Sequence, residues 1–151
     1  MLTFALAPSG SAAGASGSGI EALTSVPSAN FWLADAQGDV WAFGSAASYG
    51  SAAGLPLNHP IVALTPTNDT KGYWLLASDG GIFSYGDATF YGSTGAIALN
   101  KPIVSMAATP DGKGYWLVAS DGGIFNYGDA AFYGSTGSIV LNKPVVGMAA
   151  A

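Results

Sequence analysis

The chain has 151 residues, of which half are hydrophobic, 9% are charged and none is cysteine. This composition excludes a chain kept unfolded by high charge and low hydrophobicity, and it excludes disulfides and thiolate metal sites. The net charge of -5, carried without any arginine, argues against nucleic acid as a partner, because phosphate groups require basic contacts. No apolar run reaches the roughly 18 residues of a membrane-spanning helix, so we expect no transmembrane segment.

Residues 1–18 differ from the rest of the chain. A short apolar start is followed by a tract of glycine, alanine and serine, which is typical of a flexible linker. The apolar start with small residues at 13–15 also fits the remnant of a secretory signal, although no basic region precedes it. We therefore expect either a signal remnant or a flexible linker here.

Residues 19–151 are built by repetition at an interval of 42 residues. The segment 73–92 reads YWLLASDGGIFSYGDATFYG and returns as YWLVASDGGIFNYGDAAFYG at 115–134, while a weaker copy, FWLADAQGDVWAFGSAASYG, occupies 31–50. The sequence therefore predicts one repeat domain. Its units are expected at 19–60, 61–102 and 103–144, with a partial fourth unit at 145–151.

Each unit contains signals for four short β-strands, which are clearest in the third unit. It opens with the apolar run 103–110, which ends in a Pro-Asp-Gly turn. The segment 115–120 is rich in aromatic and aliphatic residues and stops at Asp-Gly-Gly, which is typical of a tight hairpin turn. A return limb at 124–128 and a fourth run at 131–135 follow. We therefore predict an all-β fold with four strands in each unit.

A four-stranded unit of this length is typical of a β-propeller blade, and the pattern has no helical period. We predict a propeller-like fold of tandem four-stranded blades, with a β-solenoid as the alternative. Each blade would have two apolar faces, and a neighbour on each side would bury both. Propellers close with about 4–8 blades, so three units and the first strand of a fourth predict an incomplete propeller. Either the chain is a fragment of a larger protein, or copies assemble into a homo-oligomeric ring.

The segment GYWLVASDGGIFNYGDAAFYGSTG, followed by LNKPVVGMAA, resembles a repeat of large secreted actinobacterial proteins. In those proteins the repeat occurs in tandem, often beside cell-wall hydrolase or peptidase domains. The resemblance covers residues 19–151 and is strongest in the second and third units. It implies a secreted or cell-wall-associated, propeller-like module, and it implies no catalytic motif in this chain. The first unit departs from the pattern: it has Gln37-Gly38-Asp39 for Asp-Gly-Gly, and Ser45 where the other units have aspartate.

Acidic and aromatic side chains recur in the repeats and could bind a cation or a sugar. Turn chemistry explains the aspartates of Asp-Gly-Gly, but it explains those of Tyr-Gly-Asp-Ala less fully. Most of the rings are expected to pack in the core, so only rings that face water are candidates for stacking on a sugar. We expect no cofactor and no metal, because a calcium site needs about six to eight oxygen ligands and no calcium loop is present. The candidate ligand-binding residues are Asp87, Asp129, Tyr85, Tyr91, Tyr127 and Tyr133.

The sequence predicts that the chain is not an enzyme. His59 is the sole histidine, and it stands where the other units have Lys101 and Lys143, which is not expected of a catalytic base. No Gly-x-Ser-x-Gly motif is accompanied by a histidine and an acid.

Two functional hypotheses follow from the repetition. The first is a non-catalytic extracellular repeat module that binds a protein or cell-wall partner, because several equivalent loops allow multivalent contact. The alternative is a lectin-like module that binds cell-wall glycans through one shallow pocket in each blade. The least favoured interpretation is a part of a cell-wall hydrolase whose catalytic domain lies outside this chain.

Overall fold

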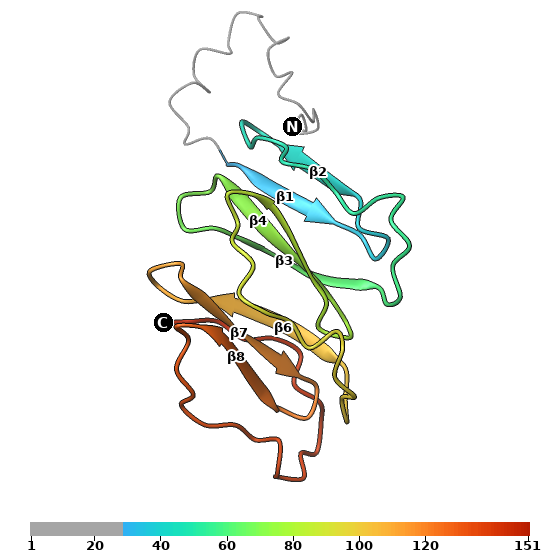
Figure 1. Cartoon of the computed structure of the whole chain (residues 1–151), viewed down its shortest axis with the longest axis vertical. Coiled ribbons are helices and arrows are strands. Elements are labelled where there is room, and N and C mark those ends of the chain that lie inside the picture. Colours follow the sequence, from blue (N-terminus) through green and yellow to red (C-terminus); the bar gives the residue numbers. More distant parts are fainter. Residues whose placement is uncertain (1–28) are drawn as a thin grey trace, which may run out of the picture.

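The computed structural model describes residues 29–151, which form eight antiparallel β-strands in three small sheets and contain no helix. The sheets follow one another along the long axis of the molecule (Figure 1). The predicted all-β fold is confirmed. The predicted signal remnant or linker at 1–18, and the opening run of the first unit, lie outside the described residues. The strands are β1 (Phe31–Ala34), β2 (Val40–Phe43), β3 (Ile61–Pro66), β4 (Gly72–Ala77), β5 (Ile82–Gly86), β6 (Ile103–Ala108), β7 (Gly114–Ala119) and β8 (Ile124–Gly128).

The first sheet is the single hairpin β1-β2, and the other two sheets are each built from two consecutive hairpins. The second sheet has the order β3-β4-β5 and the third has the order β6-β7-β8, so the tryptophan-bearing strand is central in both. The turn between β4 and β5 is the predicted Asp-Gly-Gly turn: Gly80 has a φ of 83°, and the Gly81 amide donates a 2.9 Å hydrogen bond to Asp79 Oδ1. The turn between β7 and β8 repeats this geometry at Asp121 and Gly122. The predicted hairpin turns are therefore confirmed.

The predicted fourth strand of each unit is wrong. Residues 89–93 and 131–135 form no strand, and the second and third sheets have three strands each. Residues 145–151, predicted as the first strand of a fourth unit, form none either. The run at 89–93 lies in the connection between β5 and β6.

Side-chain hydrogen bonds explain why the run after β5 is not a strand. The Trp74 indole donates to the Thr89 carbonyl oxygen (2.8 Å), and the Tyr91 amide donates to the Tyr115 hydroxyl of the next unit (3.1 Å). Because these side chains satisfy backbone groups that a neighbouring strand would otherwise pair, the run is ordered without joining the sheet.

A backbone hydrogen bond joins the start of each unit to the hairpin of the unit before it. The amides of Ile61, Ile103 and Val145 donate to carbonyl oxygens 25 residues earlier, with lengths of 3.0, 2.8 and 2.9 Å. The first strands of successive units also contact each other, since β3 lies against β6. The 42-residue interval of the sequence therefore becomes a regular contact between units.

Strand β4 is buried on both faces, and all six of its residues are buried. Alternate side chains of a strand point to opposite faces, so Tyr73 and Leu75 belong to a core cluster with Trp32 of the first unit. On the other face, Trp74 and Leu76 pack with Tyr115 of the third unit. The prediction that each hairpin has two apolar faces, each covered by a neighbour, is confirmed for the second unit.

Candidate functional site

Three of the four candidate tyrosines lie between units. The rings of Tyr91 and Tyr127 pack on Tyr115 with centroid distances of 5.6 and 5.9 Å, and Tyr85 packs in the same way on Tyr73 at 5.8 Å. All three rings are partly buried. Burial raises the pKa of Tyr85 and of Tyr127 above the ordinary value. All three therefore contribute to packing at the contacts between units.

The hydroxyl groups of Tyr73 and Tyr115 form hydrogen bonds with the backbone of the preceding unit. Tyr115 Oη accepts hydrogen bonds from the amides of Tyr91 and Gly92 (3.1 Å each) and donates to the Gly92 carbonyl oxygen (2.6 Å). Tyr73 Oη accepts a hydrogen bond from the Tyr49 amide (3.3 Å) and donates one to the Gly50 carbonyl oxygen (2.5 Å). Burial raises the pKa of both tyrosines, so both hydroxyls keep their protons near neutral pH. We call this arrangement the tyrosine anchor.

Asp87 and Asp129 are exposed and follow β5 and β8. Asp87 Oδ1 accepts a hydrogen bond from Thr67 Oγ1 (3.0 Å), and the same hydroxyl lies 3.1 Å from Asp69 Oδ1. The hydrogen bond that the Lys71 amide donates holds the pKa of Asp69 below its ordinary value. This acidic cluster orders the turn between β3 and β4. Among the residues that the structure describes, no group of three or more histidine, cysteine or acidic side chains is arranged to hold a metal ion.

Two sets of exposed apolar side chains recur, and the sequence patterns did not single them out. The first set, which we call the aliphatic row, contains Leu55, Ile97 and Ile139, with exposed fractions of 49, 54 and 58%. The backbone amide of each of these residues donates a hydrogen bond to the carbonyl oxygen three residues earlier. The same type of turn therefore carries all three side chains. The second set is Phe90 and Phe132, exposed by 56 and 59%. The adjacent Phe-Tyr pair is the sequence signal for this second set. Neighbouring residues of an extended run face opposite sides, so Phe90 faces outward because Tyr91 faces inward.

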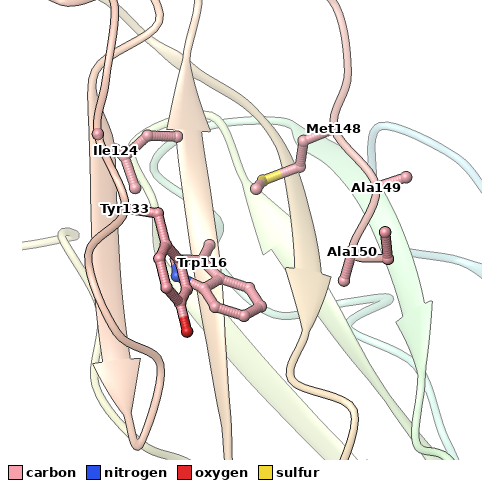
Figure 2. A pocket seen from close by; sticks show the side chains of 8 residues that line it. Trp116, Ile124, Tyr133, Met148, Ala149 and Ala150 are labelled. Atoms are coloured by element: carbon pink, nitrogen blue, oxygen red, sulfur yellow. The ribbon is translucent and has the colours of Figure 1, made fainter.

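The fourth candidate tyrosine, Tyr133, follows β8 and is 87% exposed. It lines an open cavity of about 270 Å³ beside β7 and β8. Its ring lies 6.3 Å from the ring of Trp116. Figure 2 shows these two rings together, with Met148 opposite them on the segment that carries Ala149 and Ala150. We call the surface formed by Trp116, Ile124, Tyr133, Gly134 and Met148 the open face.

The comparisons with known proteins add no assignment, because no family model, curated protein or solved structure matches the chain. Within residues 29–151, no helix is long and apolar enough to cross a membrane.

Proposed function

We propose that the chain is a non-catalytic, extracellular or cell-wall-associated module that binds a protein or cell-wall partner through the aliphatic row. The observation that carries the proposal is the recurrence of an exposed aliphatic side chain on the same turn in all three units. Single exposed apolar residues are common on protein surfaces. Three at equivalent positions, each held by the same backbone hydrogen bond, form a repeated contact.

The row suits a partner that is itself extended or repetitive. Each side chain offers only a small apolar area, so one contact alone would be weak. Contacts on linked units add through effective concentration, and the sum can exceed each single affinity by about 10²–10⁴. The resemblance of the repeat to secreted actinobacterial proteins supports a cell-wall setting for such a partner.

The test is sedimentation with actinobacterial cell walls, before and after protease treatment of the walls. The variant Leu55→Ser, Ile97→Ser, Ile139→Ser should lose most of its binding. The matched control carries the same kind of change at exposed sites outside the row, Leu33→Ser, Val62→Ser and Val146→Ser, and should sediment like the unmodified chain. Protease-treated walls separate a protein partner from a polysaccharide. Equal binding by both triple variants would refute the role of the row.

A lectin-like function is the second candidate, and the exposed phenylalanines favour it. Phe90 and Phe132 each lie three residues after an exposed aspartate, so an exposed aromatic ring and an exposed carboxylate recur together in the sequence of two units. A glycan array and titration calorimetry with peptidoglycan, chitin and arabinogalactan fragments test it. Binding that disappears in Phe90→Ser, Phe132→Ser but persists in the triple aliphatic variant would support this function over the first.

For the architecture, we propose blades of a propeller-like ring, with a β-solenoid as the alternative. The contact between the first strands of successive sheets supports the ring, because the first strands of neighbouring propeller blades meet around the central channel. Light scattering with small-angle X-ray scattering tests the proposal. A disc-shaped assembly of several chains supports ring closure, and an elongated particle whose length grows with the number of units supports the solenoid.

A further inference from the structure

The second and third units contain the same Phe-Tyr-Gly-Ser-Thr segment, at 90–94 and 132–136, in different surroundings. Tyr91 is partly buried, whereas Tyr133 is 87% exposed. Thr94 is fully buried, whereas its counterpart Thr136 is exposed. A side-chain carbon on Gly92 would strike the ring of Tyr127, while one on the corresponding glycine of the third unit would meet nothing within 4 Å. In the second unit these groups are covered by the third unit. In the third unit the same groups are exposed.

The open face already has the arrangement of an occupied interface. Trp116 and Tyr133 lie 6.3 Å apart with their planes at 48°, and the interior pair Trp32 and Tyr49 lies 6.4 Å apart at 43°. At the filled interface, the Tyr73 ring packs against the Trp32 ring at 5.6 Å with the planes tilted by 55°. The corresponding place beside Trp116 is the open cavity. No rearrangement of these rings is needed for a partner to bind, which reduces the entropic cost of association.

We propose that the open face is a docking site for a further repeat unit that carries tyrosine at the position of Tyr73 and Tyr115. The incoming hydroxyl would form the tyrosine anchor with the amides of Tyr133 and Gly134 and with the Gly134 carbonyl oxygen. The same interface forms twice within the chain: in both cases the tyrosine hydroxyl accepts a hydrogen bond from a tyrosine amide and donates one to the next glycine carbonyl oxygen. The tyrosine ring centroids are 5.8 and 5.6 Å apart, with the planes at 63° in both.

A second copy of this chain is a poorer occupant, because the unit at its other end lacks the hydroxyl. The first unit has Phe31 where the others have Tyr73 and Tyr115, and Phe43 where they have Tyr85 and Tyr127. The two phenylalanine rings stack on each other at 4.9 Å. Docked on the open face, Phe31 would bury the Gly134 amide and carbonyl without a partner, which is costly. The two ends of the described repeat array are therefore chemically distinct.

The test extends the full chain in frame after Ala151 with a second copy of residues 110–144. Amide hydrogen exchange at Tyr133 and Gly134 should slow by about tenfold or more, which is the factor expected from one net hydrogen bond. The matched control carries phenylalanine at the appended copy of Tyr115 and should lose that protection. An extended chain with Gly134→Ala should lose it as well, because the new side chain would strike the incoming unit as it would at Gly92.

Three outcomes would overturn the proposal. The first is fast exchange at Gly134 in the tyrosine extension. The second is equal protection in the tyrosine and phenylalanine extensions. The third is a concentration-dependent oligomer of the unextended chain that protects Gly134 and is abolished by Phe31→Asp, because a second copy would then be the occupant. A measurement on the unextended chain guards against poor folding of the extensions: Tyr115→Phe must speed exchange at Gly92, and unchanged exchange there would also refute the role of the hydroxyl.

Discussion

Tyr91 and Tyr133 have the same sequence neighbours, yet one ring is packed against the next unit and the other is 87% exposed. The same contrast separates Trp74, which is fully buried, from Trp116, which is only partly buried. Since the second and third units fold into the same three-stranded sheet with the same register, their internal structure does not cause the difference. Burial in this chain is supplied by the neighbouring unit, as expected of a repeat array in which each unit contacts only its neighbours.

The largest expected difference between the units concerns their tryptophans. Trp74→Ala should lower the free energy of unfolding by about 3–5 kcal/mol, because it leaves a cavity in a closed interface. Trp116→Ala should cost about 1–2 kcal/mol, because less of the ring is removed from water. Urea unfolding followed by circular dichroism measures both. Equal losses would mean that the third unit is as well packed as the second, and the contrast between them would be lost.

A pair of glycines separates packing from backbone strain. Gly92 and Gly134 have φ angles of 139° and 132°, so an alanine is strained to the same extent at both. Only at Gly92 would the added methyl group overlap a ring, that of Tyr127. Gly92→Ala should therefore be less stable than Gly134→Ala by about 1–3 kcal/mol, the usual cost of overpacking. Thermal melts of the two variants measure this difference in stability. A difference near zero would mean that Tyr127 of the third unit does not pack against Gly92 in solution.

The sequence predicted the parts of this fold that depend on local chemistry. Asp79 with Gly80 indicated a hairpin turn, and the 42-residue interval indicated units that stack. It did not predict the role of Tyr115, because the repeat pattern shows that a tyrosine recurs but not that its hydroxyl binds backbone groups of the preceding unit. The same cause made the run at 89–93 look like a strand.

The candidate site was harder to predict for a related reason. An alternating pattern does not distinguish a ring covered by the next unit from one that faces water. Tyr85 and Tyr127 were therefore grouped with Tyr133, although only Tyr133 is exposed. The exposure of Ile97 could not be predicted, because a single aliphatic residue does not indicate that its turn recurs with the side chain facing outward.

The packed tyrosines should also make the stability of the folded chain decline when the pH is raised. Burial raises the pKa of Tyr73 and Tyr115, so the folded chain holds their protons more tightly than the unfolded chain does. This contribution is complete below the unfolded tyrosine pKa of about 10 and declines as the pH rises above it. The free energy of unfolding should fall from about pH 10 upward, and Tyr115→Phe should make the fall shallower. Urea midpoints between about pH 8 and 11 measure it, and an unchanged slope in the variant would contradict the assignment.

The smallest expected effects lie in the turns between β3 and β4 and between β6 and β7, where the second and third units should behave alike. Asp69 and Asp111 accept hydrogen bonds of 3.2 Å from the amides of Lys71 and Lys113, and these bonds lower the pKa of both carboxyls. The ionised forms therefore stabilise the folded state above the ordinary aspartate pKa of about 3.9, and the contribution is lost as the pH falls below it. Asp69→Asn and Asp111→Asn should lower the melting temperature slightly and equally at neutral pH, and the difference from the unmodified chain should shrink in acid. Differential scanning calorimetry at about pH 7 and about pH 3 tests this, since unequal effects would show that even these turns depend on the next unit.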